Sequence, residues 1–221
     1  GIQGDKSLQK KVMAMLPFEL TSSQLRSGKE IEDDLASNTR MLRLLQGDVG
    51  SGKTIVALMA MLCAIEAGTQ SVIMAPTEIL ARQHFATLEP IVRSIGINIH
   101  LLTGRDKGKK REAIIEKLKN GNIQLAVGTH ALFQDDVVFK DLGIAVIDEQ
   151  HRFGVHQRLS LTSKGHSVNV LVMTATPIPR TLMLSAYGDM DVSRLSEKPA
   201  ERKSIITTKL NLSKLDEAIK G

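Results

Sequence analysis

The segment Gly47–Thr54 constrains the fold of this chain more than any other feature. It reads G-D-V-G-S-G-K-T and fits the pattern G-x-x-x-x-G-K-T at every defined position. An apolar run, residues 42–46, precedes it, and a helical pattern, residues 52–67, follows it. Glycines let backbone N–H groups turn inward around a phosphate, and the helix N-terminus adds partial positive charge. The segment therefore predicts a strand, a phosphate-binding loop and a helix.

Short apolar runs alternate with helical patterns along the rest of the chain. The expected strands are residues 42–46, 70–75, 97–102, 123–128, 143–148 and 168–173, and the expected helices are residues 52–67, 77–95, 107–119 and 179–187. Such alternation predicts an α/β fold in three layers, that of a P-loop NTPase, with a mainly parallel central sheet and helices on both faces. Pro90 predicts a break or kink in its helix.

The composition narrows the class of protein. With 221 residues the chain has room for one domain, and no apolar run approaches the ~20 residues that span a bilayer. A single cysteine, Cys63, excludes an internal disulfide framework and a zinc cluster. The net charge of +5 suits a polyanionic partner, and the 3% content of aromatic residues favours contact with a phosphate backbone over base stacking.

The phosphate loop predicts a site for ATP and Mg²⁺. Lys53 is expected to reach the β- and γ-phosphates and Thr54 to offer its hydroxyl to Mg²⁺. The acidic pair Asp148 and Glu149 follows an apolar run, with Asp148 expected to hold Mg²⁺ and Glu149 to orient or deprotonate the attacking water. A helix-capping Asp148 is the alternative. The predicted ATP-binding residues of the loop are Gly47, Asp48, Val49, Gly50, Ser51, Gly52, Lys53 and Thr54.

Four further segments carry a family resemblance. They are A-P-T-E-I-L-A (75–81), G-T-H-A-L (128–132), D-E-Q-H-R-F-G-V-H-Q-R (148–158) and T-A-T-P-I-P-R-T (174–181). Together they resemble superfamily 2 helicases and, within them, the RecG branched-DNA helicases, over the first of two RecA-like motor lobes. The corresponding lobe of a transcription-repair coupling factor is the alternative. That family shares TATPIPRT but usually has DEEH where this chain has DEQH, so RecG is favoured.

The resemblance implies roles for further residues. Gln24 would contact the adenine base, and Gln150 and His151 would sense the γ-phosphate. Contact with the DNA strand would come from Thr77, Thr129 and His130, although Thr77 also suits an ordinary helix N-cap. Coupling of hydrolysis to lobe movement would involve Gln150, His151, Thr174 and Thr176. The basic run Arg105, Lys107, Lys109, Lys110 and Arg111 is left open between DNA contact and a solvated helix start.

We expect three parts: a lead-in helix within residues 1–20, an ATP-binding lobe over 21–197, and a linker with the start of a second lobe over 198–221. The resemblance implies an ATP-dependent DNA helicase that remodels forks and Holliday junctions in recombination and repair, located in the bacterial cytoplasm. Its partners would be duplex or branched DNA, a second lobe carrying an arginine finger, and a wedge domain. Alone, the lobe would hydrolyse ATP poorly. A GTPase or kinase is less favoured, because neither an N-K-x-D motif nor an arginine-rich lid is found.

Overall fold

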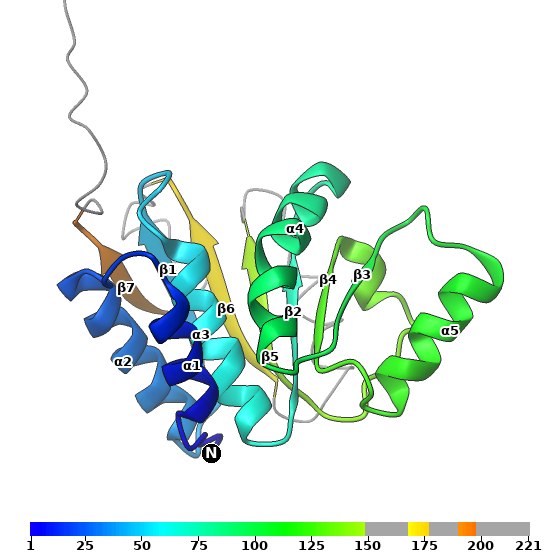
Figure 1. The fold of residues 1–221 in the computed structure, drawn as a ribbon, viewed down its shortest axis with the longest axis horizontal. Helices are drawn as coiled ribbons and strands as arrows, with labels where there is room; N and C mark the ends of the chain where they lie inside the picture. Colours follow the sequence, from blue (N-terminus) through cyan, green and yellow to red (C-terminus); the bar gives the residue numbers. More distant parts are fainter. Residues whose placement is uncertain (149–167, 177–189, 198–221) are drawn as a thin grey trace, which may run out of the picture.

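The part of the chain that the structure describes is built on one seven-stranded sheet. The structure, a computed structural model, describes residues 1–148, 168–176 and 190–197 (Figure 1). The strand order is β3-β4-β2-β5-β6-β1-β7, and all six pairings are parallel. The strands are β1 (Leu42–Gly47), β2 (Gln70–Met74), β3 (Ile99–Leu102), β4 (Leu125–Gly128), β5 (Leu142–Asp148), β6 (Asn169–Thr174) and β7 (Asp191–Leu195).

Helices cover both faces of this sheet, which confirms the predicted three-layer α/β fold. One buried cluster joins α1, α2, α3 and α4 to the sheet, and a second joins α5 and η1 to the other face. In Figure 1, α1 to α4 lie in front of the strands. The helices are α1 (Ser7–Met15), α2 (Ser22–Ala36), α3 (Lys53–Glu66), α4 (Glu78–Ser94), α5 (Gly108–Lys119) and the 3₁₀ helix η1 (His130–Phe133).

The expected strands and helices match the observed ones closely, with one correction and two omissions. Helix α4 runs without a break through Pro90, which is exposed. Of the predicted break or kink, the break is therefore wrong, and a kink stays a prediction. Water can satisfy the carbonyl freed by the lost donor on this exposed side, and buried Leu88 and Val92 hold the helix on either side of the proline. Helix α2 and strand β7 were not predicted. The helix expected over 179–187 lies outside the described residues.

The helix within residues 1–20 packs onto the lobe. Val12 of α1 is fully buried in the same cluster as α3, and the Gln9 Nε2 donates to the Met59 carbonyl at 2.9 Å. Cys63 lies in the same core, and burial raises the pKa of its thiol, as expected of inert packing. The lead-in helix is therefore part of the hydrophobic core, although where one domain ends and the next begins stays a prediction.

Candidate nucleotide-binding site

The phosphate loop connects β1 to α3 at the carboxyl end of the sheet. Strand β1 ends at Gly47, and α3 begins at Lys53 with Gly52 as its N-cap. Gly50 and Gly52 have φ values of 78° and 83°, in the left-handed region that glycine adopts without strain. A Cβ on Gly52 would also stand 2.2 Å from the Gln24 Nε2. The two glycines thus let the loop fold back onto the helix N-terminus, where an anion is favoured.

Two side chains of this loop suit a bound phosphate. The Lys53 Nζ donates to the carbonyls of Gly47 and Asp48 at 2.6 and 2.9 Å, so the ammonium is held over the loop. The Ser51 Oγ is buried and has no hydrogen-bond partner among the described residues. A buried hydroxyl in that state gains from a ligand that supplies acceptors, and triphosphate oxygens are such acceptors.

The strand order brings Asp148 to the same edge of the sheet as the loop. Strand β6 lies between β1 and β5, with Gln46 opposite Thr174 and Asp148 opposite Met173. The Thr174 hydroxyl is buried at this edge, 3.0 Å from the hydroxyl of Thr176. Thr174 therefore lies between the phosphate loop and Asp148, where a residue that couples the two would be expected. The predicted Glu149, Gln150 and His151 lie outside the described residues.

Gln24 lies against the phosphate loop. Its Nε2 donates to the Ser51 carbonyl at 2.9 Å, and its Oε1 accepts from the Thr21 backbone N–H at 2.9 Å as part of a capping box. These bonds use one amide hydrogen and one lone pair, so one of each is left for a base. Beside Gln24 is a cavity of ≈ 780 Å³, lined by Leu16, Pro17, Phe18, Glu19, Gln24, Gly50, Gly52, Thr54, Ile55, Leu58, Thr87, Leu88 and Ile91.

One residue of the site escaped the sequence analysis. The His84 Nε2 lies 2.6 Å from the Asp148 Oδ2, and both side chains are largely buried. A detectable signal existed, because His84 is a polar residue beside the buried stripe Ala81, Leu88 and Val92 of α4. A histidine at such a position predicts a polar partner, but not which one.

The three predicted DNA-contacting residues lie at the same edge of the sheet. Thr77 follows β2, is exposed and caps α4 by accepting the Leu80 N–H at 3.3 Å. Thr129 follows the neighbouring strand β4, is buried and caps η1, and His130 is exposed. The structure thus gives Thr77 its helix-cap role, and contact of all three with DNA stays a prediction.

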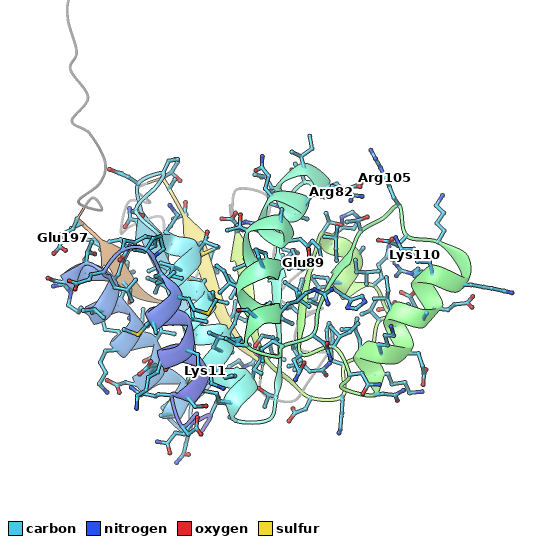
Figure 2. All side chains as sticks on the ribbon, in the orientation of Figure 1. Lys11, Arg82, Glu89, Arg105, Lys110 and Glu197 are labelled. Atoms are coloured by element: carbon cyan, nitrogen blue, oxygen red, sulfur yellow. The ribbon has the colours of Figure 1, made fainter. Side chains whose placement is uncertain are left out.

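Most of the basic run near α5 is paired within the chain. The pairs are Arg105 with Glu78 at 3.1 Å, Lys110 with Asp106 at 2.8 Å and Arg111 with Asp136 at 2.9 Å. Glu78 also accepts from Arg82, and Figure 2 shows Arg82 and Arg105 close together at the end of the molecule where α4 begins. These carboxylates offset part of the positive charge that suggested DNA contact.

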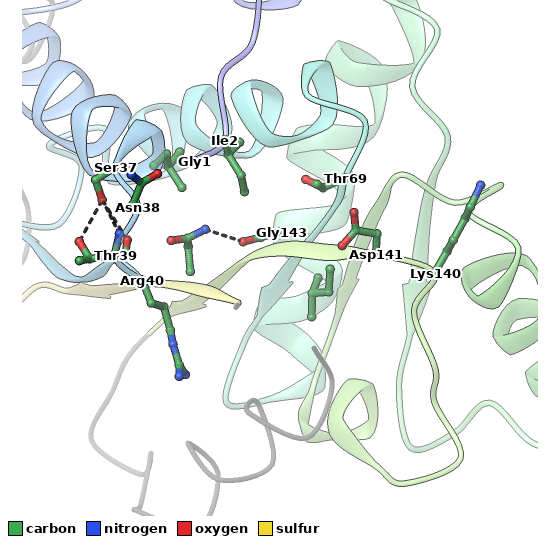
Figure 3. A pocket seen from close by; sticks show the side chains of 13 residues that line it. Gly1, Ile2, Ser37, Asn38, Thr39, Arg40, Thr69, Lys140, Asp141 and Gly143 are labelled. Carbon is green, nitrogen blue, oxygen red and sulfur yellow. Dashed lines mark hydrogen bonds between the residues drawn. The ribbon is translucent and has the colours of Figure 1, made fainter. Parts of the chain in front are cut away.

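A second cavity lies at the opposite edge of the sheet (Figure 3). It encloses ≈ 480 Å³ near Gly1, Thr39, Lys140 and Gly143. The Asn169 side chain there donates to the Gly143 carbonyl at 3.0 Å and accepts from the Met41 N–H at 2.9 Å. The amide therefore ties together the amino ends of β1, β5 and β6, which is a structural role.

Comparison with known proteins places this site in a family. The family model described as DEAD/DEAH box helicase matches residues 21–184. The chain belongs to the DEAD/DEAH box helicases. Enzymes of this helicase family use ATP, in agreement with the phosphate loop. No helix in the described part of the chain is long and apolar enough to cross a membrane.

Its relatives include proteins named ATP-dependent DNA helicase RecG. That of Pasteurella multocida (strain Pm70) is 50% identical over 96% of this helicase chain, and that of Staphylococcus aureus (strain N315) is 54% identical over 94%. The chain spans only 31% and 30% of their lengths. A structure of RecG bound to a three-way DNA junction matches all of this chain and 30% of that one, with a TM-score of 0.82 and 42% identity.

A more distant match shows the fold alone. The helicase MrfA bound to DNA matches 86% of this chain and 29% of its own, with a TM-score of 0.65 and 18% identity. The RecA-like arrangement is therefore retained where the sequences have diverged, as the parallel sheet already indicated.

Proposed function

We propose that this chain is the ATP-binding motor lobe of a RecG-type helicase, which remodels branched DNA such as replication forks and Holliday junctions. The observation that carries the proposal is the common edge of the sheet on which the phosphate loop, Thr174 and Asp148 lie side by side. The identity of 50–54% to RecG helicases supports this over the coupling-factor alternative.

In this proposal the lobe holds Mg·ATP between the loop and Asp148. Lys53 would exchange its contacts with the loop carbonyls for the β- and γ-phosphates, and Thr54 and Asp148 would hold Mg²⁺. No cluster of three or more metal-binding side chains exists in the described part of the chain, which suits an ion held by one carboxylate, a hydroxyl and the phosphates. Bound Mg²⁺ would neutralise charge on the phosphate oxygens.

The base would enter the cavity beside Gln24. Its lining includes Phe18, Leu58 and Ile91, so it offers apolar contact to a planar ring, with the Gln24 amide as the polar group that selects adenine. Glu149 would prepare the attacking water, and Gln150, His151 and Thr176 would pass the state of the γ-phosphate to the rest of the motor.

The further parts of the proposal concern the whole protein. A second RecA-like lobe would supply the arginine finger, a contribution of about 10³–10⁵ in rate in phosphoryl transfer. Thr77, Thr129 and His130 would contact phosphates along the strand without reading sequence. A wedge domain would turn translocation into remodelling, in the bacterial cytoplasm where the chromosome lies.

Thermal unfolding with different nucleotides tests the proposal for the lobe. A ligand at a hundred times its Kd stabilises the native state by about 2.7 kcal/mol, which raises the Tm of a domain this size by about 5–10 °C. We expect this rise with ATP and ADP, a larger one when Mg²⁺ is present, and a smaller one with GTP. Equal shifts with GTP would exclude the adenine site, and no shift with any nucleotide would exclude the proposed function.

A further inference from the structure

The contact between His84 and Asp148 joins two elements that are distant in the sequence. The Nε2 of His84, on α4, lies 2.6 Å from the Asp148 Oδ2, at the end of β5. The side chains are only 12% and 13% exposed. A carboxylate can only accept, so the imidazole Nε2 carries the hydrogen and donates it. A short, charge-assisted bond away from water fixes the orientation of the carboxylate.

His84 reaches Asp148 because of its place on α4. Ala81, Leu88 and Val92 bury the inward stripe of this helix, and His84 is one turn from Ala81 and from Leu88 on that side. The helix contacts β3 and β4, so its position relative to the sheet is fixed by apolar packing rather than by the histidine. The imidazole is thereby presented to Asp148 by an element that is held independently.

The bond leaves Asp148 with one oxygen engaged and one available. A carboxylate that rotates freely about its Cβ–Cγ bond can present either oxygen to a metal ion. Binding the ion stops this rotation and therefore costs conformational entropy. Because the hydrogen bond from His84 holds Oδ2, rotation of the carboxylate is restricted and Oδ1 keeps one direction. Hydrogen-bond partners of metal-binding carboxylates commonly have this effect on affinity for the ion.

We infer that His84 is a positioning residue for the metal site: it holds Asp148 in the orientation in which the carboxylate receives nucleotide-bound Mg²⁺. The inference rests on the proposed function, because it assumes that Asp148 binds the metal. It assigns His84 no contact with nucleotide. If instead the imidazole blocked the carboxylate, removing it would improve the response to Mg²⁺.

The distance of the donor atom from the backbone at position 84 gives a matched set of variants. The amide nitrogen of glutamine lies about as far from the backbone as a histidine Nε2, whereas that of asparagine lies where Nδ1 does. H84Q therefore retains a donor that reaches Asp148, and H84N and H84A do not. His100 on β3 gives the control H100Q, since its ring lies outside the site and its Nδ1 has no partner among the described residues.

The experiment measures binding of a non-hydrolysable ATP analogue by calorimetry, first in EDTA and then at stepped MgCl₂ concentrations. The binding constant in EDTA reports the phosphate loop alone and is the reference for each variant. D148N gives the response expected when the carboxylate is lost. The quantity compared is the Mg²⁺ concentration at the midpoint of the affinity increase.

We expect H84A and H84N to move this midpoint about tenfold or more to higher Mg²⁺, as loss of a carboxylate's hydrogen-bond partner does elsewhere. H84Q should recover most of the loss, and H100Q should match the wild type. Unchanged midpoints in H84A and H84N, or a lower midpoint in H84A, would overturn the inference while the wild type still binds Mg·nucleotide. No nucleotide binding by the wild type would overturn the proposed function itself.

Discussion

The side-chain amide of Gln24 donates to the backbone carbonyl of Ser51 at 2.9 Å, and so joins the start of α2 to the phosphate loop. Both residues are buried. Gln24, for which the family resemblance implies a contact with the base, thus supports the phosphate loop as well.

Replacing Gln24 should therefore weaken ATP binding even without a contact to the base. We expect about tenfold weaker binding for Q24A, because a buried carbonyl loses its donor. Q24E should bind more weakly still, since it retains the acceptor for the Thr21 N–H but places a carboxylate beside the triphosphate. Calorimetric titration with Mg·ATP measures both, with the exposed neighbour variant L25A as control. Wild-type affinity in Q24E would contradict this role.

Arg43, on β1, connects helix α2 and the edge strand β7 through a largely buried guanidinium. Its Nε lies 2.6 Å from the Asp34 Oδ2, its Nη1 donates to the Ser193 Oγ at 3.0 Å, and its side chain is 10% exposed. R43A removes the ion-pair partner of Asp34 and one hydrogen-bond partner of Ser193, which still donates to Glu30. We expect it to lower the free energy of unfolding by about 2–4 kcal/mol, less than the loss of a fully buried pair because Asp34 is partly exposed. Urea unfolding tests this. R82A, which removes an exposed ion pair with Glu78, should lower the free energy of unfolding by less than about 1 kcal/mol. Equal losses of stability in R43A and R82A would contradict the distinction between buried and exposed pairs.

Thr77 allows its helix-cap role to be separated from contact with DNA. Asp and Asn both serve as good N-caps, so T77D and T77N should keep the Tm of the wild type. T77D places a negative charge against phosphate and should weaken duplex DNA binding about tenfold at low salt, whereas T77N should not. Fluorescence anisotropy with labelled duplex gives the affinities. Should T77D bind DNA as tightly as T77N, Thr77 does not face the backbone.

His100 makes stability depend on pH. Burial, followed by the charges of Lys117 and Arg93, lowers the pKa of His100 below its ordinary value of 6.5. Below pH 6.5 the unfolded chain therefore binds more protons than the native state, and stability falls as the pH falls through the native pKa. H100Q should lose this part of the pH dependence. Urea unfolding of both proteins from about pH 7.5 to about pH 5, values on either side of the ordinary histidine pKa, measures the difference. Parallel curves of stability against pH would exclude this effect of His100.

The parts of the fold that the sequence predicted are those with continuous apolar runs. Buried parallel strands carry short apolar stretches, such as Val72, Ile73 and Met74 in β2 and residues 144–147 in β5, and these stretches are easily recognised. Strand β7 was missed because it lies at the edge of the sheet and alternates exposed and buried positions in only five residues. The phosphate loop was predictable because its glycines, lysine and threonine are contiguous.

Helix α2 was missed for a different reason. Of its five buried residues only Ile31 and Leu35 are apolar, whereas Ser23, Gln24 and Ser27 are polar, so the apolar period is weak. The pair Thr21 and Gln24 does form a capping box, which marks a helix start. Contacts such as that of His84 with Asp148 depend on how α4 packs across the sheet, and no local pattern encodes that distance.

Lys53 is the side chain on which binding of a nucleoside triphosphate to this lobe should depend most, and titrations of Mg·ATP into the wild type and K53A measure that dependence. Removing a charged donor to phosphate should weaken binding by about tenfold to a hundredfold. K29A, at an exposed ion pair on α2, should bind as the wild type does. Wild-type affinity of K53A for Mg·ATP would contradict this role of Lys53.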